Sequence, residues 1–394
     1  MTVILIYATF ILLVIVLLIV NIYFINEIIR KRNFNKKLEK NLLEIDPIIK
    51  RHLSYKDINK IDKKEINNLM TMVLSRKGLE SFNIWCSDYI KKNGFTQEFK
   101  NYIDLIIDYK VLLGNRIVRE RYKNSYILYL LSLYKIDTKE AFEYAFSLLD
   151  DKSLYARNNA LRVIQNSKDE TDIMKALNTI NETEHYFNNK IIIDFITEFS
   201  GDKSAFHTLL IKNFEGFDTD MKKIFIEYFT NIGEEDSKVS GHMFNILKNS
   251  EILELVIAAT KYFGEVINTE AKKLILKNLD SEFWELRAVS GKVIEYYKDE
   301  VIVERLEAKL TDSNWYVRYN SALSLINITN GKERDRMLKI SDGFAREIYI
   351  YALFTKGIID INEYQKLSKN IVDQKKSKDV INQKGKIFAE QVAV

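Results

Sequence analysis

The sequence predicts an all-α protein in which a single N-terminal transmembrane helix precedes an array of helical repeats. Three observations predict this fold class: a motif that recurs along the chain, an uncharged apolar segment at the N-terminus, and the overall composition. The 394 residues include one Pro and 13 Gly, and 47% of them are hydrophobic. A composition so poor in helix-breaking residues, with enough apolar residues for a large core, is typical of a nearly all-helical chain.

The recurring motif reads LDDKSLYAR at 149–157, LDSEFWELR at 279–287 and LTDSNWYVR at 310–318. Each copy places a Leu eight residues before an Arg, with an Asp between them. Stepping back from Arg318 by 31 to 33 residues each time gives the equivalent positions, which are Arg287, Leu255, Lys222, Asn189, Arg157 and Asn124. So regular a spacing predicts similar helical units, each of which packs on its neighbours in the chain.

Each of these reference positions is expected to begin the second helix of a helix pair. Apolar or small residues recur three, four and seven places after it, which is the pattern of one buried helical stripe. Apolar runs upstream supply the first helices, at 140–149, 173–180, 239–247, 269–279 and 301–310. The Asp-containing segments between the two helices are short, so they are expected to form tight turns.

This motif resembles that of the HEAT-repeat family, whose units carry Leu-x-Asp, then Val-Arg, a pair of small residues and a Leu. The unit with Leu310, Asp312 and Arg318 matches this pattern almost throughout, whereas the units at 189, 222 and 255 keep the spacing without the Arg. The resemblance covers residues 85–355 and implies a HEAT-type α-solenoid. It also implies that the Asp and Arg side chains link one unit to the next, so we interpret them as structural rather than catalytic.

The N-terminal apolar segment, Val3 to Ile25, has 23 consecutive residues without a charge and is interrupted only by Thr9 and Asn21. At about 1.5 Å per residue it can cross a hydrocarbon core of about 30 Å. A cleaved signal peptide fits less well, because no Lys or Arg precedes the segment and no small-x-small cleavage site follows it. A buried core helix so apolar would need cover on all sides, which an open array does not offer. We therefore predict a membrane anchor.

The charges that follow the anchor predict its orientation. Six cations lie within fifteen residues of it against two acidic residues, whereas the first 26 residues carry no charged side chain. By the positive-inside rule the C-terminal bulk is cytoplasmic, and the protein is a single-pass protein of the inner (plasma) membrane with its N-terminus outside. The six cations are Arg30, Lys31, Arg32, Lys36, Lys37 and Lys40.

Four segments follow from these patterns. They are the transmembrane anchor at 1–26, a basic juxtamembrane helical linker at 27–81, the repeat array at 82–367 and a polar C-terminal tail at 368–394. Within the linker, Asp46 followed by Pro47 is expected to cap and restart a helix.

The sequence predicts no catalytic residue, no cofactor and no metal site. The histidines His52, His185, His207 and His242 are far apart and lack metal-ligand spacing, and there is no Gly-rich phosphate loop or G-x-S-x-G elbow. Glu234 and Glu235 are interpreted as a solvated turn, and Trp284 and Trp315 as wedges between units. The net charge of +4 does not favour a nucleic acid, and the single cysteine, Cys86, excludes an internal disulfide.

The partner predicted is a protein, itself associated with the membrane, and the surface predicted to bind it is the concave face of the array. Positions one and five after each reference residue are expected to point away from the buried stripe, and they include Val256, Thr260 and Ala288. The surface is mixed in charge, which is typical of a protein-binding groove and equally of an ordinary solvated face. The candidate binding residues are Arg162, Lys190, Asp194, Lys223, Glu227, Lys292 and Tyr319.

A narrower resemblance suggests which partner to expect. The single membrane helix, the basic segment, the array and the closing sequence DGFAREIYIYAL at 342–353 are together similar to bacterial membrane-anchored HEAT proteins found beside family-2 glycosyltransferases. This resemblance implies a scaffold accessory to exopolysaccharide export. Two alternatives stay open. One is a HEAT-like enzyme of the lyase or DNA glycosylase type; a DNA glycosylase would need a concave basic face with aromatic residues. The other is a membrane-surface sensor of lipid charge.

Overall fold

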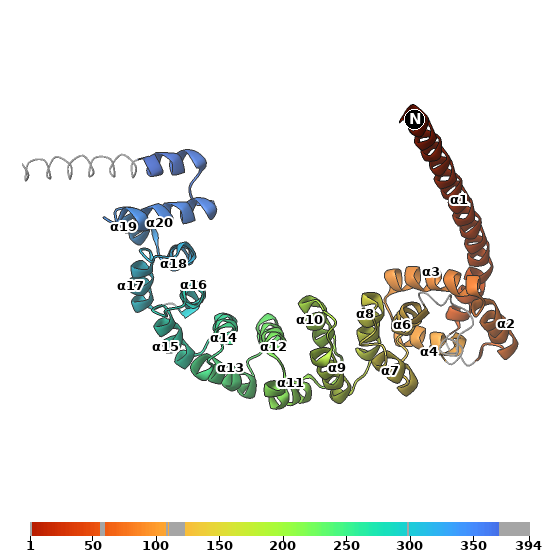
Figure 1. Cartoon of the computed structure of the whole chain (residues 1–394). Helices are drawn as coiled ribbons and strands as arrows, with labels where there is room; N and C mark the ends of the chain where they lie inside the picture. The colour runs from red at the N-terminus through yellow and green to blue at the C-terminus, as the bar shows by residue number, and fades with distance from the viewer. Residues whose placement is uncertain (1, 56–59, 108, 110–122, 298, 370–394) are drawn as a thin grey trace, which may run out of the picture. The chain divides into compact units, whose positions relative to one another are not determined.

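The computed structural model describes residues 2–55, 60–107, 109, 123–297 and 299–369. Every regular element among these residues is a helix, which confirms the predicted all-α class (Figure 1). The chain divides into two compact units, Met1–His185 and Tyr186–Val394, which are described separately. Nearly all of the predicted tail at 368–394 lies outside the described residues.

Helix α1 of the first unit runs without interruption from Thr2 to Ser54 (Figure 1). Its N-terminal part is long and apolar enough to cross a membrane, with a mean hydropathy of 2.6 over an 18-residue stretch that is not buried. A signal sequence near the N-terminus would have the same length and composition. Its C-terminal part belongs to the core, because Ile45 and Ile49 are at most 1% exposed. The helix of the apolar segment therefore continues beyond residue 26 into the core of the first unit.

The helix restart expected at Pro47 is wrong. Proline removes the N–H that would bond the carbonyl of Leu43 and its ring crowds that carbonyl, but Leu43 is itself highly exposed. Asp46 does not act as a helix cap, because its carboxylate accepts hydrogen bonds from Trp85 Nε1 and Lys50 Nζ, both at 2.8 Å. The packing of α1 against α3 (Arg76–Asn93) stabilises the helix on both sides of the proline.

The rest of the first unit consists of short helices that pack on their neighbours. α3 packs against both α1 and α2, and its hydroxyl at Ser81 donates to the carbonyl of Leu38 on α1 at 3.3 Å. The predicted boundary between linker and array at 81/82 falls inside α3. The further helices are α2 (Lys63–Val73), α4 (Gln97–Ile106), α6 (Lys123–Leu133), α7 (Lys139–Phe146), α8 (Leu154–Ile164) and α9 (Glu170–Glu182).

The second unit is a succession of helix pairs. Its elements are α10 (Asn189–Thr197), α11 (Lys203–Asn213), η3 (Phe214–Gly216), α12 (Thr219–Ile232), α13 (Ser237–Asn249), α14 (Leu253–Glu265), α15 (Thr269–Asn278), α16 (Trp284–Val293), η4 (Ile294–Tyr297), α17 (Glu300–Lys309), α18 (Trp315–Ile328), α19 (Gly331–Met337) and α20 (Gly343–Thr355). Each of α13, α15 and α17 packs on the helix that follows it. The even-numbered helices α10 to α20 also pack on one another in order, and we call them the second-helix row (Figure 1).

The repeat spacing in the sequence correctly predicts where the second helix of each pair begins. All seven reference positions lie in the first turn of a helix, in α6, α8, α10, α12, α14, α16 and α18. The residues three, four and seven places later are all buried except Ala258, which is half-buried. Small residues in this stripe allow close packing: a Cβ built on Gly291 of α16 would lie 2.9 Å from Ser321 Oγ on α18.

Candidate functional site

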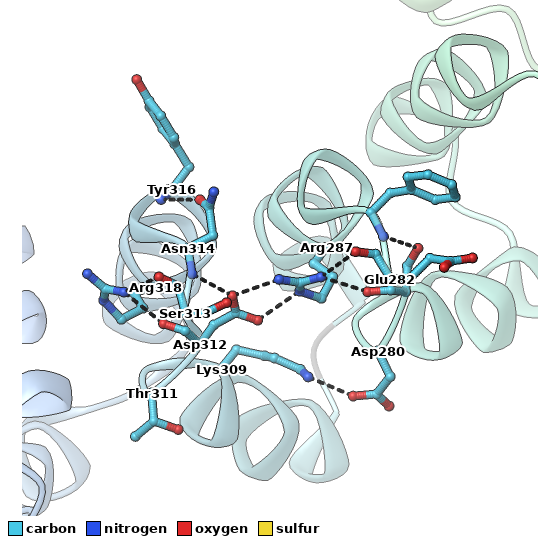
Figure 2. Close-up of polar contacts among 12 residues, drawn as sticks. Asp280, Glu282, Arg287, Lys309, Thr311, Asp312, Ser313, Asn314, Tyr316 and Arg318 are labelled. Atoms are coloured by element: carbon cyan, nitrogen blue, oxygen red, sulfur yellow. Dashed lines mark hydrogen bonds and ion pairs between the residues drawn. The ribbon is translucent and has the colours of Figure 1, made fainter.

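The recurring Arg ties together the turn that precedes it. In Figure 2 the Nη1 of Arg287 donates to the carbonyls of Ser281 at 2.8 Å and Glu282 at 3.0 Å. Arg318 makes the same pair of bonds, to Asp312 O at 2.7 Å and Ser313 O at 3.0 Å, and Arg157 repeats them in its own turn. The three Arg residues therefore satisfy carbonyls that the turn between two helices leaves without an intrahelical partner.

Arg287 also links its unit to the next one. Its Nε and Nη2 donate to the two carboxylate oxygens of Asp312 at 2.8 and 2.9 Å, a bidentate pair (Figure 2). Burial raises the pKa of the Asp312 carboxyl, but the hydrogen bonds from Arg287 and from the Asn314 N–H outweigh it and hold the pKa below its usual range. Both partners are largely enclosed, at 14% and 8% exposure. Their hydrogen-bonding groups are engaged with each other, as a structural link requires.

The predicted partner-binding residues lie on the helices expected. Arg162 is on α8 of the first unit, and the others are on α10, α12, α16 and α18 of the second. Lys223 and Tyr319 are half-buried, and the rest are exposed. Lys223 and Glu227 are brought together in one hollow of about 510 Å³, which residues of α10, α12 and α14 also line, including Glu254 and Lys261.

Three positions expected to point away from the stripe are instead buried. Val256, Thr260 and Ala288 are 9%, 0% and 6% exposed. Helix α14 packs against α12, α13 and α16, so little of its circumference is left for solvent. The hydroxyl of Thr260 is accommodated there because it donates to the carbonyl of Val256 at 2.8 Å.

Tyr319 belongs to an aromatic cluster that the sequence patterns did not reveal. Trp315 stacks on Tyr319 with ring centroids 4.8 Å apart, and Tyr351 of α20 lies 5.7 Å from Tyr319. Trp284 of α16 stacks on Tyr316 of α18 at 5.6 Å. The two tryptophans thus contact the following helix pair, as wedges would, but they remain 39% and 41% exposed. The signal available in the sequence was WYxxY at 315–319.

Buried histidines form a second group that only the fold assembles. His207 lies between Tyr228, whose hydroxyl is 2.9 Å from Nε2, and Glu234, whose carboxylate is 3.0 Å from Nδ1. Glu234 and Glu235 do lie in the link after Gly233, and Glu235 is exposed, but Glu234 is half-buried and pairs with His207 rather than being only solvated. His52 in the first unit is held in the same way by Tyr102 and Glu65, at 3.1 and 3.3 Å. Because Tyr228, Tyr102 and His52 are fully buried, these groups serve the core.

We expect the stability of the second unit to depend on pH through His207. Burial lowers the pKa of His207 despite the opposing charge of Glu234, and burial lowers the pKa of His242 as well. An unfolded histidine titrates near about 6.5, so below that pH the unfolded chain takes up protons that the folded one does not. Stability is therefore lost as pH falls from 7 to 5. Urea unfolding at pH 7, 6 and 5 should show a smaller decrease in the free energy of unfolding in His207→Gln than in the parent protein. An identical decrease in both would mean that groups other than His207 cause the pH dependence.

Within the residues that the structure describes, no group of three or more His, Cys, Asp or Glu side chains is arranged to hold a metal ion. The candidate site is thus a surface: the exposed side of the second-helix row with its mixed charges and its aromatic cluster. Exposed aromatic rings beside a hollow are features that protein-binding surfaces share in general.

Comparison with known proteins yields structural matches only. No family model matches the chain, and no curated protein does. An engineered protein solved in a structural genomics programme has 14% sequence identity, covers 78% of this chain and 98% of its own, and has a TM-score of 0.32.

Two natural proteins are also among the matches. The complex of CpcE and CpcF of phycocyanin lyase from Nostoc sp. PCC7120 has 12% identity, 67% and 95% coverage and a TM-score of 0.23. Human deoxyhypusine hydroxylase in complex with glycerol has 13% identity, 74% and 95% coverage and a TM-score of 0.25. Since each of these TM-scores is below 0.5, none of them assigns a fold family or an activity to this chain.

Proposed function

We propose that this protein is a membrane-tethered scaffold, in which a HEAT-type α-solenoid holds a protein partner at the cytoplasmic face of the membrane. The observation that carries the proposal is the continuity of α1. One helix from Thr2 to Ser54 contains both the apolar segment and core residues of the first unit. The apolar segment and the core of the first unit are thus parts of one helix.

This continuity favours an anchor over a cleaved signal sequence. A cut after the apolar segment would fall inside a helix whose downstream part is packed against α3. The helix from Ile25 to the buried Leu38 is 13 residues long, so it places the core about 20 Å from the end of the apolar segment. A helix of this length acts as a rigid stalk.

The basic residues support a cytoplasmic repeat array rather than a lipid sensor. With α1 along the bilayer normal, Arg30, Lys31 and Arg32 lie about 8–10 Å beyond Ile25, near the headgroups. Lys37 and Lys40 lie about 18 and 22 Å beyond it, further than the Debye length of about 8–10 Å allows for strong attraction. The three basic residues near the headgroups therefore suffice to orient the chain, whereas those further along α1 are too distant to bind lipid headgroups strongly.

The second-helix row supports a protein as the partner. Its solvent-accessible side chains alternate in sign along α10 and α12, with Lys190, Asp194, the half-buried Lys223 and Glu227, which does not suit a DNA glycosylase groove. The aromatic cluster around Trp315 offers the exposed Trp and Tyr rings that dominate binding energy in protein interfaces. The repeat spacing and the Arg287–Asp312 link support the HEAT-type assignment. The resemblance described above makes a membrane glycosyltransferase the first partner to test.

A topology experiment tests the tether. In intact cells, a cysteine at Thr2 should react with a membrane-impermeant thiol reagent, and one at the exposed Ser204 should react only after the cells are opened. The native Cys86 is fully buried and serves as an internal background. Release of the chain as a soluble protein without residues 2–25, or the reverse labelling pattern, would rule out the proposed function.

A further inference from the structure

A groove runs between α1 and α3 on the first unit. It has a volume of about 850 Å³ and an apolar floor that includes Leu42 and Leu43 of α1 with Ile84 and Trp85 of α3. Leu43 is 78% exposed and Ile84 37%, so these side chains lack cover from the described part of the chain. The bond from Trp85 Nε1 of α3 to the Asp46 carboxylate of α1, described above, fixes the two walls relative to each other.

The shape of the groove suits a helix. Its residues on α1 extend from Glu39 to Ser54, which is about 22 Å or four helical turns. They recur at intervals of three and four residues, which keeps them on one face of α1, as in helices that pack side by side. The members on α1 are Glu39, Leu42, Leu43, Asp46, Lys50, Leu53 and Ser54.

The same face of α1 continues into the apolar segment and carries a polar group there. Asn21 precedes Glu39 by 18 residues, about five full turns, so both point to the same side of the helix. Asn21 Nδ2 donates to the carbonyl of Leu17 at 2.9 Å, which leaves one N–H and the side-chain oxygen for another partner. Inside a bilayer, such an amide favours association with a neighbouring helix that can hydrogen-bond to it.

The charges between Asn21 and the groove indicate which helix binds. A hollow lined by Ile28, Lys31, Arg32, Asn35, Lys36 and Glu39 lies on this face. Two copies of this chain cross the membrane in the same direction, so a pair formed through this face would bring Arg32 and Lys36 of one copy against the same residues of the other. Like charges in that arrangement oppose pairing. The face is complementary to a different helix with acidic residues at this level.

We propose that an integral membrane partner binds along this face of α1 with a transmembrane helix that continues into the cytoplasm. Its span hydrogen-bonds to Asn21, acidic side chains meet Arg32 and Lys36, and its cytoplasmic end places apolar residues, spaced by three and four, into the α1/α3 groove. This proposal rests on the proposed function, because it requires α1 to span the membrane.

Photo-cross-linking in native membranes tests the proposal. A benzophenone amino acid at Leu43, and separately at Ile84, should form an adduct with the same integral membrane protein, and mass spectrometry should place the adduct in a helix that directly follows a span. Lys37, which is exposed and about 120° around α1 from Leu43, is the matched control and should give no such adduct. Adducts with a second copy of the chain, adducts only with soluble proteins, equal adducts from Lys37, or no adduct would each overturn it.

The membrane part of the contact has its own matched pair of variants. Asn21→Leu should lower the adduct yield at Leu43 by about three- to tenfold, the effect of losing one interhelical hydrogen bond. Asn26→Leu should leave the yield unchanged, because Asn26 lies about 140° around the helix from Asn21. Equal losses in the two variants would mean that this face of α1 is not used.

The two proposals fail in different ways. If Thr2 is labelled outside and a cross-linker at Tyr319 captures a membrane protein while Leu43 and Ile84 capture none, only the α1 face is excluded. If Thr2 is not outside, the tether fails and the α1 face fails with it.

Discussion

Replacing Asp312 with Ala should lower the free energy of unfolding of the second unit by about 2–3 kcal/mol. The change leaves the guanidinium of Arg287, 14% exposed, without the two carboxylate bonds at 2.8 and 2.9 Å that link α16 to the next turn. It also removes the acceptor for the Asn314 N–H, 2.8 Å away, so the turn before α18 is weakened as well. Urea unfolding of the detergent-solubilised chain measures the loss.

Asp280→Ala is the matched control for this substitution. Asp280 pairs with Lys309 at 2.6 Å and also with Arg305, but it is 54% exposed, so the control should cost less than about 1 kcal/mol (Figure 2). The lowered pKa of Asp312 gives a second measurement. The stability that Asp312 contributes is fully present above its pKa in the unfolded chain, about 3.9, and is lost as the pH falls through its lower pKa in the folded chain. Equal effects of the two substitutions would mean that the Arg287–Asp312 link contributes no more than a surface pair.

Replacing Ile49 with Ala should destabilise the first unit by about 2–4 kcal/mol. Ile49 is fully buried although it lies on the helix that carries the apolar N-terminal segment, so the substitution leaves a cavity where α1 packs against α3. Proteolysis or hydrogen exchange of residues 38–93, followed by mass spectrometry, measures the local loss.

Leu43→Ala provides the contrast on the same helix. Leu43 is 78% exposed, so its truncation should change stability by no more than about 0.5 kcal/mol. The partner cross-link from Ile84 should nevertheless weaken in this variant, because Leu43 lines the groove. Comparable destabilisation by the two substitutions would show that α1 does not pack as described beyond the apolar segment.

The helix pairs were predictable because their signal is local. A stripe at three, four and seven residues after each reference position marks one side of a helix, and the observed burial follows it in all seven units. The link between units that the resemblance implies for the Arg residues is present between Arg287 and Asp312. The bonds of Arg157, Arg287 and Arg318 to carbonyls of their own turns were not predicted.

The sequence missed features that depend on neighbours distant in the chain. Val256 and Thr260 carry no local sign of burial; the packing of α12, α13 and α16 around α14 excludes them from solvent. Pro47 is a strong local breaker, yet contacts with α3 outweigh the loss of one hydrogen bond. The aromatic cluster needs rings from α16, α18 and α20 to meet, and the His207 group needs α11 and α12 to close on Glu234.

The sequence by itself determined the all-helical class, the unit spacing and the apolar N-terminal segment, because each of these can be read from the order of apolar and polar residues along the chain without knowledge of what packs on them. Only the tertiary structure decided that α1 is one helix with both an apolar, unburied part and a core part, and that it forms a groove with α3. The physical reason is that a helix face acquires a role only from what packs on it: Ile49 and Leu43 of α1 are equally apolar, and the packing of the first unit buries Ile49 and leaves Leu43 exposed.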